Sequence, residues 1–117
     1  MEQKEREESL SRDEAVVLVD HIAAALAYLG ITPQTLRELG LNKLLGYLAL
    51  LYAWGRHQPT SRSELQPIPP ALAEQMKEVL DKYPRRGGGQ APNGEAIIEA
   101  AKRALDRLSS FTTVKLR

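Results

Sequence analysis

Two histidines, His21 and His57, are the side chains in this sequence best suited to acid–base or metal chemistry. General acid–base catalysis and nucleophile activation both require a second titratable group nearby, usually a carboxylate or another histidine. Asp20 directly precedes His21, and adjacent side chains on a helix point about 100° apart, so these two cannot form a dyad. His57 lies between Arg56 and Gln58, a setting typical of an exposed helix end. We therefore expect no catalytic residue and no enzymatic activity.

A metal site or a bound cofactor would need ligand types that this chain largely lacks. The sequence contains no cysteine, which excludes disulfides, thiolate zinc sites and cysteine nucleophiles. Its two histidines have no carboxylate at the spacing of a metal-binding motif. The sequence therefore predicts neither a metal nor a cofactor.

The glycine-rich stretch from Arg85 to Gly94 has some ingredients of an anion site. Glycine backbone lets N–H groups approach a phosphate, and a following helix start favours negative charge. A nucleotide-binding P-loop, however, requires Gly-Lys-Ser/Thr at the helix start, whereas this chain has Asn93, Gly94 and Glu95 there. We interpret the stretch as a flexible surface linker.

Basic side chains in the last third of the chain favour a sequence-independent contact with a nucleic-acid backbone rather than a nucleotide-binding loop. The candidate nucleic-acid-binding residues are Arg85, Arg86, Lys102, Arg103 and Arg107, which Lys115 and Arg117 could extend. Glu95, Glu99 and Asp106 dilute this face, and the formal net charge of the whole chain is only +1. No exposed aromatic residue is interleaved for base stacking. Nucleic-acid binding is therefore the alternative to the main functional hypothesis below.

The most unusual feature of the sequence is the apolar run from Leu41 to Trp54, which would leave a helix with almost no polar side. A helix that is apolar all round is normally buried on every side, by its own chain or by another. Because a chain of 117 residues has limited material for wrapping a central helix, the run indicates an oligomer or a complex subunit. The expected interface residues are Leu44, Tyr47, Leu48, Leu51, Tyr52 and Trp54. We interpret the aromatic residues among them as core or interface anchors rather than as a small-molecule site.

Capping signals and apolar spacing predict the helices that must position these residues. Ser11 and Glu14 have the spacing of a capping box, which starts a helix that ends at Gly30. The polar strip of this helix is thin, so we expect it to be buried on most sides. Further helices are expected over 34–39, from an Asn42 cap to 55–57, over 70–83 and over 95–109, with a proline-rich connector before the fourth.

Together these signals predict an all-α fold, a compact bundle of four to five helices with a flexible glycine-rich loop before the last helix. We expect one helical domain over 11–109. A charged, disordered lead-in over 1–10 precedes it, and an extended tail over 110–117 follows. Apolar and polar residues alternate weakly in the tail, with Val114 and Leu116 as the apolar positions. The tail could therefore add as an edge strand to a neighbouring chain.

The main functional hypothesis is a non-enzymatic helical assembly subunit of a larger protein or nucleoprotein complex. It would associate through the two most apolar helices, expected over 11–30 and 42–57, as a homo-oligomer or within a hetero-complex. The alternative is a nucleic-acid-binding subunit, such as a ribonucleoprotein small subunit or a virion coat protein, that makes sequence-independent backbone contacts.

The expected location is the cytoplasm, or the virion if the protein is viral. The acid-rich start, Met1 to Ser9, leads into no signal-type apolar core. The longest apolar stretch, Leu44 to Trp54, is much shorter than the roughly 20 residues that span a bilayer, so we expect no membrane partner.

Overall fold

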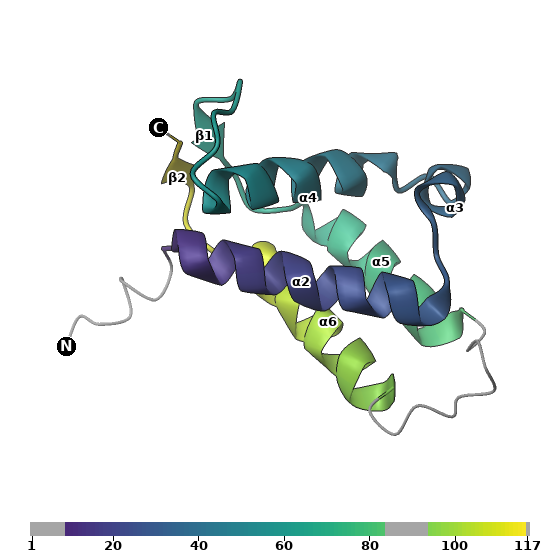
Figure 1. Cartoon of the computed structure of the whole chain (residues 1–117). Coiled ribbons are helices and arrows are strands. Elements are labelled where there is room, and N and C mark those ends of the chain that lie inside the picture. Colours follow the sequence, from purple (N-terminus) through teal and green to yellow (C-terminus); the bar gives the residue numbers. More distant parts are fainter. Residues whose placement is uncertain (1–8, 84–93, 117) are drawn as a thin grey trace.

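The computed structural model describes residues 9–83 and 94–116, and it confirms an all-α bundle (Figure 1). Its helices are α2 (Arg12–Leu29), α3 (Pro33–Glu38), α4 (Asn42–Gly55), α5 (Pro70–Lys82) and α6 (Gly94–Leu108). Two short strands, β1 (Glu64–Leu65) and β2 (Val114–Lys115), form the only sheet in this part of the chain. Most of the glycine-rich loop expected before the last helix lies outside the described residues.

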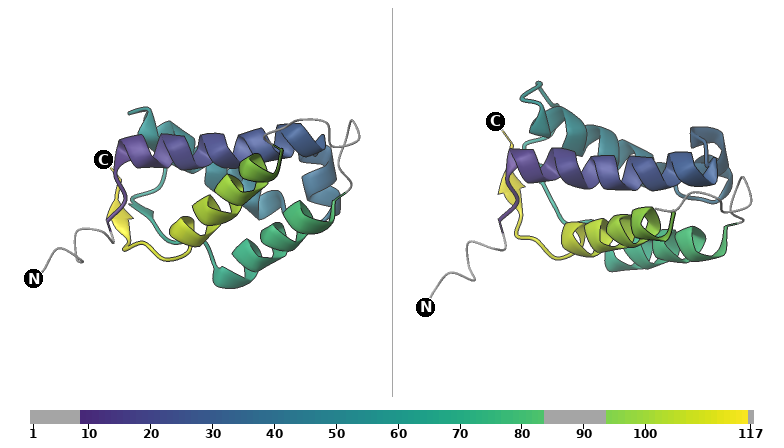
Figure 2. Two further views of the ribbon diagram at one scale, coloured as in Figure 1. Left: turned by 90° about the horizontal axis from the view of Figure 1, so that it is seen from below. Right: turned by 60° about the horizontal axis from the view of Figure 1, so that its bottom comes forward.

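Helix α2 is the central element of the bundle. It packs against α4 on one side and α6 on another, and α5 lies beside α6. The right-hand view of Figure 2 shows α2 between α4 and the pair formed by α6 and α5. Ala15, Leu18, Ile22, Ala25 and Leu29 are the buried residues of α2. Because they recur every three or four residues, they form a single stripe that faces the core.

Local capping fixes both ends of α2, but the Glu14 carboxylate binds Arg107 and does not complete the predicted capping box. The Ser11 side chain accepts a hydrogen bond of 3.1 Å from the backbone N–H of Glu14. At the other end Gly30 has a φ of 73°, and the N–H of Ile31 donates to the carbonyl of Leu26 at 2.8 Å. This pattern is a Schellman motif, in which a left-handed residue satisfies the last carbonyls of a helix.

The start of α4 differs from the sequence prediction. Asn42 is the first helical residue rather than the cap, and Leu41 occupies the cap position without a side-chain hydrogen bond. The cause lies in the preceding turn. Gly40 has a φ of 79°, and the N–H of Leu41 donates to the carbonyl of Leu36 at 2.7 Å. Because this turn leads directly into the next helix, no extended residue is left to act as an asparagine cap.

The two chain ends of the described region are anchored to the bundle. Leu10, which the sequence assigns to a disordered lead-in, is buried. In the tail, Phe111 and Leu116 are buried, and Val114 pairs antiparallel with Leu65. The prediction that the tail pairs with a neighbouring chain is therefore wrong in its partner, since the connector before α5 supplies that strand.

Side chains three or four residues apart share a face of a helix, and α4 has three such faces. The core face is buried and comprises Leu44, Leu48, Leu51 and Gly55. The second face borders the segment 62–69 and comprises Lys43, Gly46, Tyr47 and Leu50. The outer face is exposed or half-buried and comprises Leu45, Ala49, Tyr52 and Arg56. Within the single chain, α4 is therefore not enclosed on all sides. The same holds for α2, because Val17 is an exposed apolar residue.

Two glycines of α4 have opposite surroundings. A Cβ atom at Gly55 would lie 2.7 Å from Cγ2 of Val16 and 2.9 Å from the backbone oxygen of Arg12, so no side chain fits there. A Cβ atom at Gly46 would have nothing within 4 Å. Gly55 is therefore required by the packing of α4 on α2, whereas Gly46 is not required by any described neighbour.

Alanine at these two positions should change stability in opposite directions. Gly55→Ala should destabilise the fold by about 1–3 kcal/mol, because α2 and α4 must move apart. Gly46→Ala should stabilise it by up to about 1 kcal/mol, because alanine is the better helix former and meets no neighbour. Urea unfolding of both variants measures the two changes. Equal effects of the two substitutions would contradict this packing.

Candidate functional site

The candidate acid–base residues do not come together. His21 is exposed on α2, and Nδ1 of His57 lies 3.2 Å from Nη1 of Arg12 rather than beside a carboxylate. Over residues 9–83 and 94–116, no group of three or more histidine, cysteine, aspartate or glutamate side chains is placed to hold a metal ion.

The candidate nucleic-acid-binding residues differ in their surroundings. Arg85 and Arg86 lie outside the described residues. Nζ of Lys102 lies 2.8 Å from Oδ1 of Asp81 on α5 and 3.1 Å from Oε2 of Glu99. Arg103 is exposed. Lys102 is therefore already neutralised within the chain.

Arg107 forms the most complete ion pair of the candidate set. Its Nε and Nη2 donate to the two carboxylate oxygens of Glu14 at 2.7 and 3.1 Å. Nη2 also donates to the backbone oxygen of Ser9 at 2.7 Å. This two-pronged geometry is the preferred one between arginine and carboxylate, so Arg107 ties the end of α6 to the start of α2.

Lysine residues on α5 and α6 form a ladder of ion pairs across the two helices. Nζ of Lys77 lies 2.6 Å from Asp106 and 3.0 Å from Glu74, which mirrors the two pairs of Lys102. Hydrogen bonds to these carboxylates raise the pKa of both lysines, with Asp106 the largest contributor for Lys77. The face around the ladder carries five acidic and three basic side chains: Glu74, Glu78, Asp81, Glu99, Asp106, Lys77, Lys102 and Arg103. Its formal charge is therefore negative, which disfavours a nucleic-acid backbone.

The expected interface residues are divided between the core and the surface. Leu44, Leu48, Leu51 and Trp54 are buried within the chain itself. Because its own chain covers them, they are not available to a partner in this fold. The hydroxyl of Tyr47 donates to the backbone oxygen of Gln66 at 3.0 Å, and burial raises the pKa of this phenol. Of the six residues, only Tyr52 is classed as exposed.

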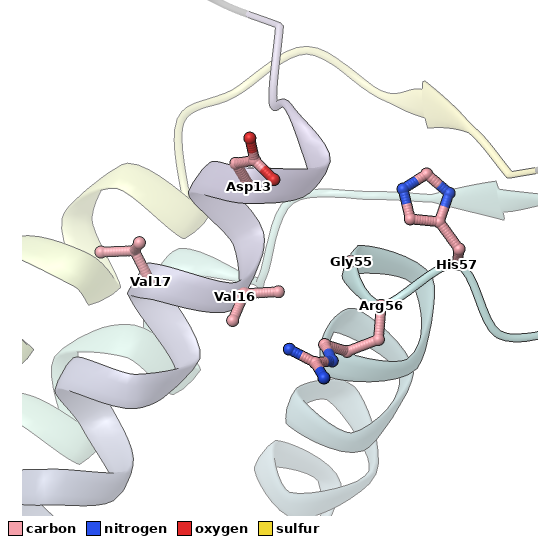
Figure 3. A pocket seen from close by; sticks show the side chains of 6 residues that line it. All are labelled: Asp13, Val16, Val17, Gly55, Arg56 and His57. Atoms are coloured by element: carbon pink, nitrogen blue, oxygen red, sulfur yellow. The ribbon is translucent and has the colours of Figure 1, made fainter.

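A groove lies between the start of α2 and the end of α4, and we call it the α2–α4 groove (Figure 3). Its volume is about 480 Å³, and its lining residues are Asp13, Val16, Val17, Gly55, Arg56 and His57. Figure 3 shows Val16 pointing from α2 towards the end of α4. The guanidinium of Arg56 lies 5.8 Å from the ring centre of Tyr52, which continues the surface along α4. The groove thus has an apolar floor with an acidic residue on one wall and a basic residue on the other.

Beside this groove, Arg12 joins the start of α2 to the end of α4. Its Nη1 donates to the backbone oxygen of Trp54 at 2.9 Å, and its guanidinium carbon lies 5.2 Å from the centre of the Trp54 ring. A cation there interacts favourably with the last carbonyls of α4 and with the aromatic face. His57, just beyond the helix, has a φ of 63°, a left-handed conformation that non-glycine residues rarely adopt.

A second hollow lies on another side of α4, and we call it the Gly46 groove. Its volume is about 660 Å³. Its lining residues are Lys43, Gly46, Tyr47, Leu50, Arg62, Leu65, Gln66, Pro67, Ile68, Pro69 and Leu72. The sequence interpretation missed both grooves. A glycine inside an apolar helix was the one available signal for the second, whereas the α2–α4 groove depends on contacts between distant segments.

Comparisons with known proteins add no functional assignment. The chain matches no protein-family model, and no curated protein or solved structure is significantly similar to it. Within the described residues, no helix combines the length and the apolar character needed to cross a membrane. Function must therefore be argued from the two grooves and from the charged surfaces.

The ladder between α5 and α6 should weaken at alkaline pH. The folded-state pKa values of Lys77 and Lys102 are raised above 10.5, so the ladder is fully stabilising below that pH. Its contribution is lost as the pH rises through the folded pKa values. A Lys77→Arg/Lys102→Arg variant stays charged and should lose less stability between about pH 8 and pH 11 than the wild type. Urea unfolding at both pH values tests this, and equal losses would contradict it.

Proposed function

We propose that this chain is a non-enzymatic helical assembly subunit that associates with a second copy of itself through the outer faces of α2 and α4. The observation that carries the proposal is the position of two exposed apolar side chains. Val17 of α2 is 50% exposed and Tyr52 of α4 is 40% exposed. Val17 lines the α2–α4 groove, and Tyr52 contacts Arg56 on its opposite wall. Both side chains therefore border the α2–α4 groove, and we infer that they contribute to one interaction surface.

The spacing of the exposed residues favours a helix as the partner element. Seven positions on α2 are exposed, and His21 and Ala23 are two of them. The other five follow one another by four, three, four and three residues: Asp13, Val17, Asp20, Ala24 and Ala27. This is the alternation of a helix-packing seam. The alanines near its far end let another helix approach closely. The outer face of α4, with Leu45, Ala49, Tyr52 and Arg56, has the same alternation.

The charges of the surface favour a second copy over an unrelated partner. Asp13 and Arg56 line opposite walls of the α2–α4 groove, and neither forms an ion pair with a described residue. In a twofold dimer the same patch faces itself, so an acidic wall of one copy meets the basic wall of the other. The surface is therefore self-complementary in both charge and apolar character.

Substitution of Val17 and Tyr52 tests the proposal. The wild type, of 13.0 kDa per chain, should sediment as a dimer at micromolar concentration. Val17→Asp/Tyr52→Glu should sediment as a monomer with unchanged helicity, because both positions are on the surface of the single chain. Leu39→Asp is the matched control, since Leu39 is 37% exposed but lies in neither stripe. A monomeric wild type would overturn the proposal.

A charge exchange distinguishes a twofold dimer from other associations. Asp13→Arg and Arg56→Asp should each weaken the dimer, because each places like charges opposite one another. The two changes together should restore it. If the wild type is a dimer but both single variants and the double variant dimerise equally well, the self-complementary arrangement is contradicted.

Nucleic-acid binding is the alternative function, and it has its own test. Lys102 and Arg107 already bind carboxylates, so Arg85, Arg86 and Arg103 are the remaining candidates. If these arginines contact phosphates, their replacement by alanine should flatten the salt dependence of DNA or RNA binding by about one unit of slope each. We expect the triple variant and the wild type to bind equally weakly over a salt series. A steep wild-type dependence that the variant loses would favour the alternative.

A further inference from the structure

The Gly46 groove combines a closed apolar floor with an open mouth. Leu65 and Ile68 are fully buried at its base, and the half-buried Tyr47, Leu50 and Leu72 form its sides. The Tyr47 hydroxyl is bound to the backbone oxygen of Gln66, which holds one wall against α4. The groove is therefore a defined part of the fold.

Gly46 keeps this groove open at a cost to the helix. Glycine inside a helix is less favourable than alanine by about 1 kcal/mol, so its presence needs a physical reason. Gly55 and Gly94 have such a reason, because Val16 and Tyr28 respectively occupy the space that a side chain would need. At Gly46 a Cβ atom would meet nothing within 4 Å. The missing side chain of Gly46 thus serves the hollow itself and no contact within the described chain.

Two unpaired cations lie at the mouth of the groove. Lys43 projects from α4 and Arg62 from the connector, and both are exposed. The side chains of Lys43 and Arg62 form no ion pair or hydrogen bond with any described residue. Lys77, Lys102 and Arg107, in contrast, each bind carboxylates. The groove therefore has apolar side chains along its walls and two positively charged side chains among its lining residues.

The size of the groove favours a small molecule over a helix. Its volume of about 660 Å³ falls within the range of small-molecule sites, roughly 300–1,000 Å³. A helix with side chains is about 10–12 Å wide, so the hollow would hold little more than one turn of it. The matching ligand has an apolar body for the floor and a negative group for the rim.

We propose that the Gly46 groove binds a small amphipathic anion, with its carboxylate or phosphate head at the rim, bound by Lys43 or Arg62, and its alkyl chain over Leu50 and Leu72. Arginine and lysine bind both kinds of head group, and the alkyl chain gains free energy by leaving water. The site is independent of the proposed dimer surface, because Gly46 and Tyr52 point about 120° apart on α4.

Titration with octanoate, followed by amide NMR of the full chain, tests the proposal. Octanoate should shift the signals of residues that line the groove at millimolar concentration or below. Octan-1-ol and octylammonium, which lack the negative head, should bind about tenfold more weakly or not at all. Octyl phosphate in a parallel titration shows which head group the site prefers. Equal shifts with octylammonium and octanoate, or none with either anion, would overturn the proposal.

Two variants separate the groove from nonspecific binding. Gly46→Leu fills the hollow without a clash in the core, and Lys43→Ala/Arg62→Ala removes the rim charges. Each should weaken octanoate binding by about tenfold or more, while helicity and oligomer mass stay unchanged. The matched controls, Ala96→Leu on the exposed side of α6 and Lys82→Ala/Arg103→Ala, should bind octanoate as the wild type does. Unchanged binding by a folded Gly46→Leu variant would refute the site, whatever the outcome for the dimer.

Discussion

The close contact of Gly55 with α2 is the constraint on which the rest of the arrangement depends. A Cβ atom there would lie 2.7 Å from Val16 and 2.9 Å from the backbone of Arg12, so the two helices meet with no room for a side chain at this position. At that separation Arg12 reaches the carbonyl of Trp54 and covers its ring. The buried faces of both helices then close into one core with α6. The remaining faces of α4 are turned outward by the same contact.

Local sequence signals predicted most of the helix boundaries, because capping and turn formation involve residues that are neighbours in the sequence. Ser11, Gly30 and the Tyr83–Pro84 junction mark helix ends whose physical cause lies within a few residues. The partner of the C-terminal strand was not predictable in this way. Val114 pairs with Leu65, and this depends on how α5 and α6 bring distant segments together. The three-way division of α4 was hidden for the same reason, since composition shows apolar residues but not what covers each of them.

Charged residues show the same limit of sequence reasoning. The sequence places Lys102 and Arg107 among basic neighbours on one helix, which favours a surface for phosphates. In the fold, Asp81 reaches Lys102 from α5 and Glu14 reaches Arg107 from α2. A basic side chain that already binds a carboxylate gains little from a phosphate, because the existing pair must first be broken. Among the described cations without such a partner, Arg103 was in the predicted set, whereas Lys43, Arg56 and Arg62 were not.

An apolar helix in a short chain can therefore be accommodated without enclosure on every side. The leucine face of α4 is buried in the core. The outer face of α4 lies next to the α2–α4 groove, which residues of α2 also line. The third face borders the Gly46 groove, where the connector covers only part of it. A fully buried α4 would need a further layer that 117 residues do not provide. Because the two partly covered faces differ in charge and depth, a second copy and a small anion can each bind its own face without competing for the other.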